Sequence, residues 1–158
     1  MKTEKTNAMR ILDKEKLSYK VHTYAHGKEA VDGLHVAQLL KEDPEKVFKT
    51  LLCVSNKKQY YVFVVPVCHE LSMKKCAKAV HEKNMEMIHV KDIIRISGYI
   101  RGGCSPIGMK KQYPTIFHET CMLFDTILFS GGKIGIQIEM KPKDAVDLLQ
   151  AQCADIIL

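Results

Sequence analysis

The feature that most constrains the fold is the run Val47–Val54 (VFKTLLCV), which places apolar residues on both faces of a strand with a period of two. Such a strand must be covered on both sides. A second β-rich run, 60–67, follows the polar turn 56–59 and predicts an antiparallel hairpin. Lys49 stands out, because an ammonium in a central strand is costly unless an anion or carbonyl oxygens meet it. It either faces a pocket that binds a carbonyl or phosphate group, or reaches water from the end of the strand.

The rest of the chain predicts a mixture of helices and strands. Residue spacing predicts helices at 7–17, 34–41, 72–81, 90–96 and 142–150, and strands at 18–24, 85–88, 126–129 and 134–140. Asp43-Pro44-Glu45 has the composition of a helix start. Residues 97–114 are expected to form turns and loops, and the apolar tail 154–158 is expected at a sheet edge. Because the strands do not alternate regularly with crossover helices, the pattern indicates a mixed α+β domain and argues against a doubly wound sheet.

Length and charge narrow the class of protein. A chain of 158 residues fits one domain that is stable without disulfides or a structural metal. The sequence has no apolar run long enough to span a membrane and no signal-peptide core at its start, so a cytoplasmic protein is expected. The formal charge of +6 favours an anionic partner, although a lysine-rich surface that aids solubility would give the same number.

The cysteines and histidines form no recognisable metal or redox motif. The six cysteines include no CxxC pair, and the seven histidines have no metal-ligand spacing, so no metal and no cofactor is expected. Most cysteines lie in apolar stretches, where they are expected to pack as reduced core residues. Cys104 is the one candidate nucleophile, and it would need a histidine or a helix N-terminus nearby to lower its pKa. No GxSxG elbow is present for a catalytic serine.

Two glycine-rich segments could present backbone N–H groups to a ligand oxygen. They are Gly98–Gly108 (GYIRGGCSPIG) and Ser130–Lys133 (SGGK). Closely approaching N–H groups can form an anion-binding nest or an oxyanion hole. Neither segment matches a Walker or a dinucleotide-binding motif, and both could be plain turns.

Three blocks in this order, VFKTLL at 47–52, the glycine-rich segment at 98–108 and SGG at 130–132, resemble the YbaK/EbsC family. The resemblance covers nearly the whole chain, including HTY at 22–24, PTI at 114–116 and ADI at 154–156. Family members are freestanding editing domains, similar to the domain inserted in bacterial prolyl-tRNA synthetase, and they deacylate mischarged tRNA. The KTLL and SPIG blocks are most similar to the branch that clears Cys-tRNA(Pro) and also Cys-tRNA(Cys). The resemblance implies one editing domain over residues 1–158, with a mixed, largely antiparallel, barrel-like sheet and flanking helices.

The resemblance also implies a site and a mechanism. Lys49 would be the catalytic residue, placed to hold the terminal adenosine or the ester region of the substrate. The implied substrate-binding residues are Tyr24, Thr50, Gly98, Gly102, Gly103, Ser105, Ser130 and Gly131. The cysteinyl thiol would attack its own ester and leave as a cyclic thiolactone, or a tRNA hydroxyl would assist, which makes the enzyme a thiolactone-forming lyase or a hydrolase. The protein would supply proximity, orientation and oxyanion stabilisation.

Two departures from the family pattern leave alternatives open. Cys104 stands where relatives usually have an aliphatic residue, and Gln137 stands where they often have Asp. The alternatives are an Ala-tRNA(Pro) deacylase and a non-catalytic module that binds a nucleotide or the tRNA acceptor end. The expected partner is mischarged tRNA, alone or in a ternary complex with prolyl-tRNA synthetase, and no membrane is expected. Contacts with phosphates are predicted for Lys57, Lys58, Lys74, Lys75, Lys78, Lys110 and Lys111.

Overall fold

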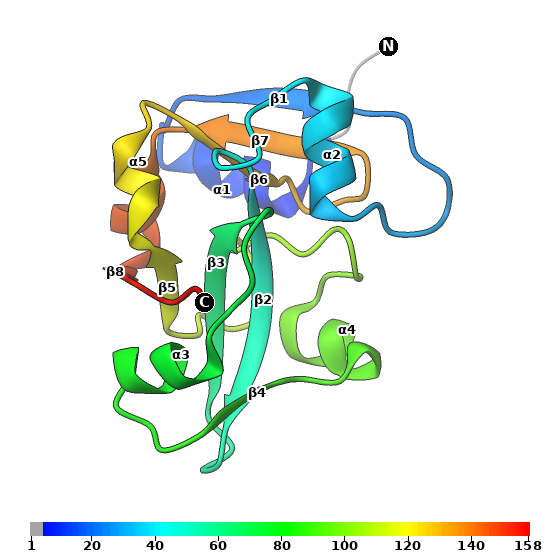
Figure 1. Cartoon of the computed structure of the whole chain (residues 1–158). Coiled ribbons are helices and arrows are strands. Elements are labelled where there is room, and N and C mark those ends of the chain that lie inside the picture. The colour runs from blue at the N-terminus through cyan, green and yellow to red at the C-terminus, as the bar shows by residue number, and fades with distance from the viewer. Residues whose placement is uncertain (1–4) are drawn as a thin grey trace.

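The computed structural model describes residues 5–158 as two β-sheets flanked by short helices (Figure 1). The helices are α1 (Asn7–Lys14), α2 (Gly33–Leu40), α3 (Met73–Ala79), α4 (Ile93–Ser97) and α5 (Pro142–Leu149), with 3₁₀ turns η1 (Val90–Asp92) and η2 (Glu119–Leu123). The strands are β1 (Tyr19–Thr23), β2 (Phe48–Ser55), β3 (Tyr60–Pro66), β4 (Met85–Met87), β5 (Thr115–His118), β6 (Ile127–Ser130), β7 (Ile136–Met140) and β8 (Gln152–Ala154). Side chains cap three of the helices: Thr6, Asp32 and Ser72 accept hydrogen bonds from the first turns of α1, α2 and α3.

The larger sheet has the strand order β4-β2-β3-β5-β8 and the smaller sheet has the order β1-β7-β6. β2 and β3 pair antiparallel from Phe48↔Pro66 to Val54↔Tyr60, which confirms the predicted hairpin. β5 and β8 add in parallel beside β3, so the larger sheet is mixed. The smaller sheet is antiparallel throughout.

The expectation of a barrel-like sheet is wrong. Within residues 5–158 both sheets are open, with edges at β4 and β8 in one and at β1 and β6 in the other. The two sheets meet at one isolated parallel bridge, Val47↔Leu128. The far end of β2 is already paired with β4 at Cys53–Ser55, so only the start of β2 can reach β6, and the sheets do not close into a barrel.

A polar cluster around Glu139 reinforces this junction. The Lys46 ammonium, just before β2, lies 3.1 Å from a carboxylate oxygen of Glu139 on β7. His22 of β1 lies 2.7 Å from the same carboxylate, which also accepts a hydrogen bond from the Thr126 hydroxyl. The backbone adds a bond from Leu128 N to Lys46 O at 3.0 Å. These contacts attach the smaller sheet to Lys46, directly before the central strand.

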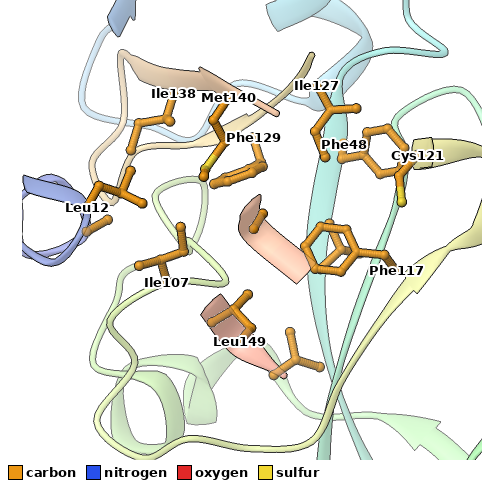
Figure 2. Close-up of a cluster of buried hydrophobic side chains, with 14 of the residues drawn as sticks. Leu12, Phe48, Ile107, Phe117, Cys121, Ile127, Phe129, Ile138, Met140 and Leu149 are labelled. Atoms are coloured by element: carbon orange, nitrogen blue, oxygen red, sulfur yellow. The ribbon is translucent and has the colours of Figure 1, made fainter. Parts of the chain in front are cut away.

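The main hydrophobic core lies between the two sheets and is closed by α1 and α5. Figure 2 shows Phe129, Ile138 and Met140 of the smaller sheet gathered with Leu12 of α1 and with Phe48 and Phe117 of the larger sheet, all of them almost completely buried. A second cluster, on the other face of the larger sheet, includes Phe63, Val65 and Cys76. Both faces of β2 and β3 are therefore covered, as the apolar run predicts.

Most predicted elements are confirmed, with differences of a few residues at their ends. Asp43-Pro44-Glu45 is wrong as a helix start: Lys46 N donates to Asp43 O at 2.9 Å and closes a turn that leads directly into β2. Strand β5 was not predicted, and the tail contributes strand β8 slightly earlier than expected, at Gln152–Ala154. Within residues 5–158, every helix is too short or too polar to cross a lipid bilayer.

Candidate active site

A cavity of about 970 Å³ opens beside the start of β2. Its walls come from four parts of the chain: the segment 28–36 leading into α2, residues 47–52 of the central strand, the segment 87–104 around α4, and residues 130–137 between β6 and β7. Its volume lies within the range of small-molecule sites, roughly 300–1,000 Å³. The three blocks that carry the family resemblance therefore meet around one cavity.

Lys49 lies in the wall of this cavity. Its side chain is 26% exposed, and its ammonium lies 3.7 Å from a carboxylate oxygen of Glu70, whose own side chain is 79% exposed. β2 fixes the position of Lys49 through its pairing with Val65 of β3. The desolvation cost of an ammonium in a covered strand is thus reduced, because Lys49 reaches the cavity and pairs with the exposed Glu70 carboxylate.

Two buried oxygen atoms around the same cavity lack a hydrogen-bond partner. They are Thr50 Oγ1, next to Lys49 on β2, and Gln137 Oε1 on β7, and both residues line the cavity. Gln137 is only 6% exposed. Buried polar groups are nearly always paired, so unpaired ones in a cavity wall indicate positions where a ligand can supply the missing partner.

Tyr24 and Ser130 also line the cavity. Tyr24 is 8% exposed, and its backbone N–H donates to Gly135 O at 3.0 Å. Ser130 Oγ accepts a hydrogen bond from Gly132 N at 3.1 Å. Both residues are held by the 130–135 turn, which places them beside the cavity.

Of the predicted glycines, only Gly102 lines the cavity, and Gly98, Gly103 and Gly131 are not among the residues of its wall. Their N–H groups donate within the protein, to Ile94 O, Ile100 O and Ile136 O respectively. These bonds stabilise the loops, and because the three N–H groups already donate to backbone oxygens, they are not available to a ligand. Ser105 is fully buried, and its hydroxyl accepts from Ile107 N at 3.2 Å, so it stabilises the same loop from within.

The two glycine-rich segments pack against each other. A Cβ on Gly103 would lie 3.1 Å from Lys133 Cα and from Ile134 N. A Cβ on Gly102, where φ is +84°, would lie 2.6 Å from Ala30 Cβ. Gly102 therefore favours glycine strongly, because Ala30 approaches closely and its backbone is left-handed, whereas a side chain at Gly103 would need the facing backbone to shift by a few tenths of an ångström.

The sequence interpretation missed several cavity residues. Arg101 and Lys28 add cationic side chains to the wall, and Glu29 and Asp32 add carboxylates. Arg101 could have been predicted from the sequence, because it lies inside the glycine-rich block, directly before Gly102. An apolar wall was also missed because its residues lie in short, irregular elements: Met87, Ile88, Val90, Ile93 and Ile100.

Cys104 lines the cavity, but its surroundings do not activate it. Burial raises the pKa of its thiol to about 11, and the Ser97 hydroxyl lowers it only in part. No histidine is found among the described residues that line the cavity. At neutral pH Cys104 is therefore a protonated thiol without a neighbouring base, which disfavours it as a nucleophile.

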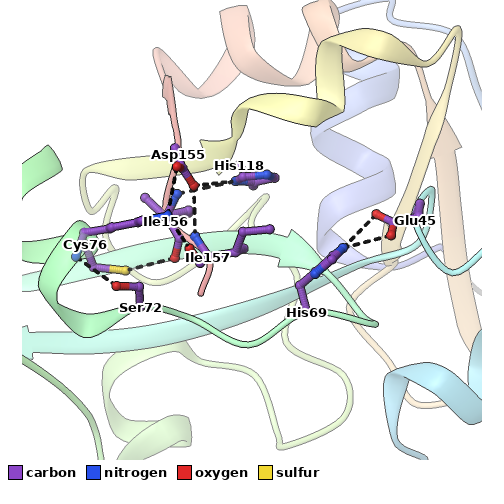
Figure 3. A network of polar contacts seen from close by, with 9 residues as sticks. Glu45, His69, Ser72, Cys76, His118, Asp155, Ile156 and Ile157 are labelled. Carbon is purple, nitrogen blue, oxygen red and sulfur yellow. Dashed lines mark hydrogen bonds and ion pairs between the residues drawn. The ribbon is translucent and has the colours of Figure 1, made fainter.

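Among residues 5–158, two groups of side chains have the composition of metal ligands, and both lie outside the cavity wall. Glu45, Cys68 and His69 form one group, in which His69 Nε2 lies 2.8 Å from Glu45 Oε1 (Figure 3). The second group combines His22 and Glu139 with Glu42, and there the Lys46 ammonium lies between the carboxylates as an internal cation.

Comparison with known proteins gives consistent matches. A family model described as an aminoacyl-tRNA editing domain matches residues 28–148. EbsC of Enterococcus faecalis, a proposed Cys-tRNA(Pro)/Cys-tRNA(Cys) deacylase, is 44% identical over 153 residues, which are 97% of this chain and 93% of that protein.

Solved structures show the same fold. A proposed trans-editing enzyme for prolyl-tRNA synthetase superposes with a TM-score of 0.82 at 21% identity, covering 99% of both chains. The hypothetical protein APE2540 superposes with a TM-score of 0.87 at 16% identity, covering 97% of this chain and 100% of the other. At such low identities these likenesses concern the fold alone.

Proposed function

This chain belongs to the aminoacyl-tRNA editing domain family, as its resemblance to YbaK/EbsC proteins indicated, and we propose that it is a trans-editing deacylase that clears mischarged Cys-tRNA(Pro) and Cys-tRNA(Cys). We also propose that residues 1–158 form one editing domain. Its place of action would be the cytoplasm, where tRNA is charged.

The observation that carries the proposal is the cavity beside Lys49. It combines a cation in a covered strand with two unpaired buried oxygens, Thr50 Oγ1 and Gln137 Oε1. A site of this kind suits a ligand that brings both an electron-rich carbonyl and hydrogen-bonding groups, as the aminoacyl ester of a terminal adenosine does. We assign Lys49 to the ester region, and Tyr24, Thr50, Gly102 and Ser130 to the walls around it.

Substrate-assisted chemistry fits the groups available in the cavity. The cysteinyl sulfur of the substrate would attack its own ester carbonyl, forming a C–S bond while the C–O bond to the ribose breaks. The thiol proton ends on the ribose oxygen, and the cysteine leaves as a thiolactone that water can open. Lys49 would stabilise the oxyanion of the tetrahedral intermediate, and the walls would hold the sulfur near the carbonyl carbon. The protonated state of Cys104 supports this route over a protein nucleophile.

The cationic residues suggest how the acceptor end is held. Arg101 and Lys28 both line the cavity, and a guanidinium can bind a phosphate with two parallel hydrogen bonds. We propose that these residues bind the phosphates nearest the terminal adenosine. The body of the tRNA would be selected elsewhere, on the protein or in a ternary complex with prolyl-tRNA synthetase.

A deacylation panel tests the proposal. Cys-tRNA(Pro), Ser-tRNA(Pro), Ala-tRNA(Pro) and Pro-tRNA(Pro) would be incubated with the full chain, and the released compounds identified by mass spectrometry. Ser-tRNA(Pro) is the matched control, because it replaces the thiol by a hydroxyl of similar size. Rapid loss of cysteine with slow loss of serine and alanine is expected.

Other outcomes of the deacylation panel would contradict parts of the proposal or identify the type of reaction. Equal rates on cysteine and alanine would overturn the thiol-assisted route and favour the alanine-type deacylase. Tight binding of Cys-tRNA(Pro) with no acceleration of deacylation would overturn the enzymatic assignment and leave a binding module. Release of thiolactone identifies a lyase-type step. Release of cysteine alone, at times shorter than a thiolactone needs to open in water, identifies direct hydrolysis.

A further inference from the structure

Two cysteine thiols, one buried and one exposed, lie side by side near the C-terminal end of the chain. Cys121 Sγ and Cys153 Sγ are 3.9 Å apart. Cys121 belongs to η2 and is completely buried, whereas Cys153 belongs to β8 and is exposed. A dissolved reagent can therefore reach Cys153, while the neighbouring Cys121 thiol is shielded from solvent.

The fold holds both thiols in place. β8 pairs with β5 in parallel, with Cys153 opposite Phe117, and η2 begins directly after β5. The segment after β8 is also anchored: Ile156 N donates to His118 Nδ1 at 3.4 Å, and Ser72 N donates to Ile156 O at 2.9 Å. Figure 3 shows this attachment of the C-terminal segment around Ile156. The short distance between the sulfurs is therefore built into the sheet.

The other cysteines lack this combination. Cys53 and Cys76 are both completely buried, and burial raises the pKa of each thiol to about 12. Cys68 and Cys104 lie in separate loops, where Cys68 faces Glu45 and Cys104 lines the cavity. All six cysteines lie within the described residues, and Cys121 with Cys153 is the pair in which one sulfur contacts another and one partner is exposed.

We propose that Cys121 and Cys153 are a modification site, at which a low-molecular-weight disulfide such as oxidised glutathione converts the two thiols into an intramolecular disulfide. A disulfide requires sulfurs about 2.05 Å apart. The 3.9 Å separation therefore leaves a short approach, which rotation of the exposed Cys153 side chain on its edge strand can supply. The proposal is independent of the deacylase function.

The reaction proceeds in two exchanges that balance. The Cys153 thiolate attacks one sulfur of the small disulfide, forms a mixed disulfide and releases one thiol. Cys121 then loses its proton to solvent, and its sulfur attacks Cys153 Sγ and releases the second thiol. Two protein thiols are oxidised by two electrons, and one disulfide is reduced to two thiols. Burial, reinforced by Cys153, raises the pKa of Cys121 to about 12, which agrees with Cys153 as the first residue to react.

The disulfide would close a loop that contains part of the candidate site. Residues 121–153 include β6, β7 and α5, and with them Ser130 and Gln137 of the cavity wall. A crosslink of this kind restricts the unfolded chain and stabilises the fold. The oxidised protein is therefore expected to unfold at a temperature several degrees higher than the reduced protein.

Peptide mapping of the full chain tests the proposal. The reduced protein would be treated with oxidised glutathione at neutral pH, alkylated and digested with trypsin without reduction. Trypsin places Cys121 alone in Gln112–Lys133 and Cys153 alone in Asp144–Leu158. A crosslinked pair of these peptides is expected, together with an intact mass lower by two hydrogens and the loss of two titratable thiols.

Single variants separate the steps. Cys121→Ser is expected to stop at one glutathionyl group on Cys153, and Cys153→Ser is expected to retain a free Cys121. Cys68→Ser, which removes a partly exposed cysteine outside the pair, is the matched control and must still form the crosslink. A wild-type protein that retains glutathione on Cys153 with no crosslinked peptide, or that crosslinks between molecules, would overturn the proposal.

Discussion

The Lys49 ammonium lies 3.7 Å from the Glu70 carboxylate, in a pair whose two members differ greatly in exposure: 26% of the Lys49 side chain is accessible and 79% of the Glu70 side chain. A pair with one partner so exposed contributes about 0–1 kcal/mol. A substrate oxygen can therefore replace Glu70 at little cost. β2 fixes the cation, and the turn after β3 supplies a counter-ion that can be displaced.

Removing Lys49 should abolish editing and leave the fold intact. We expect Lys49→Ala to lower kcat/KM on Cys-tRNA(Pro) by about 100-fold or more, the effect of losing one oxyanion donor. The free energy of unfolding should change by less than about 1 kcal/mol, because the pair with Glu70 is weak. Single-turnover deacylation and thermal unfolding measure the two effects. Lys14→Ala, at the exposed end of α1, is the control, and a near-normal rate in Lys49→Ala would remove Lys49 from the chemistry.

Neutralising Glu70 should strengthen substrate binding. Because Glu70 competes with the substrate for Lys49, we expect Glu70→Gln to lower KM by about 2–5-fold, which corresponds to the energy of an exposed pair, with little change in kcat. The difference should shrink as salt is added, since salt screens the competing charge. Glu86→Gln, on the exposed edge strand β4, should change neither constant. A higher KM in Glu70→Gln would mean that Glu70 binds the substrate.

The central part of the site was predictable because it depends on local patterns. Lys49 interrupts an apolar run, and that anomaly predicts either a pocket or a strand end that reaches water; the structure has Lys49 in the wall of the cavity. Thr50 follows from its position next to Lys49. Gly102 was expected only through the family resemblance, because a glycine-rich segment taken alone could equally be a plain turn. The hairpin of β2 and β3 has the same local origin, in two β-rich runs joined by a polar turn.

The other cavity residues and the arrangement of the strands depend on contacts between distant segments, which local sequence patterns do not predict. Lys28 lines the cavity only because the segment before α2 folds over the start of β2. β5 has only four residues, Thr115–His118, all of them buried, so it shows no alternation and takes its identity from pairing with β3. The expected barrel failed for a similar reason, because closure depends on which edge of β2 remains free after β4 has paired.

The Glu139 cluster should make stability fall in acid. Burial alone would raise the pKa of Glu139, but hydrogen bonds from Thr126, His22 and Lys46 outweigh it and lower the pKa from 4.5 to about 2. A lowered folded-state pKa means that the stabilisation is complete above about pH 4.5 and is lost as the pH falls towards 2. We expect the free energy of unfolding, measured in urea, to decrease across this range.

The substitution Glu139→Gln should remove most of that dependence. It is expected to cost about 1–3 kcal/mol at pH 7, as the loss of a charged hydrogen-bonding partner does, and to flatten the curve between pH 4.5 and 2. Glu15→Gln, at the exposed end of α1, is the control and should reproduce the wild-type curve. A Glu139→Gln variant that keeps the full acid dependence would assign it to other carboxylates.

The substitution Gly102→Ala should damage the cavity through Ala30. The new Cβ would lie 2.6 Å from Ala30 Cβ, at a residue whose φ of +84° already disfavours alanine. We expect a loss of about 1–3 kcal/mol in the free energy of unfolding from the strained backbone. We also expect a fall of about 10-fold or more in kcat/KM, because Ala30 lines the cavity and must move.

A second substitution distinguishes the clash from the strain. Adding Ala30→Gly to Gly102→Ala removes the contact with Ala30 Cβ but keeps the left-handed backbone and leaves the Cα of residue 30 at 3.0 Å from the new Cβ, so activity should recover in part while the loss of stability remains. Gly27→Ala is the matched control, because a Cβ there meets nothing within 4 Å, and it should leave both quantities unchanged. If Gly102→Ala kept wild-type kcat/KM, the contact between the glycine-rich loop and Ala30 would not shape the site. If the double variant recovered no activity, the lost rate would come from the altered backbone at Gly102.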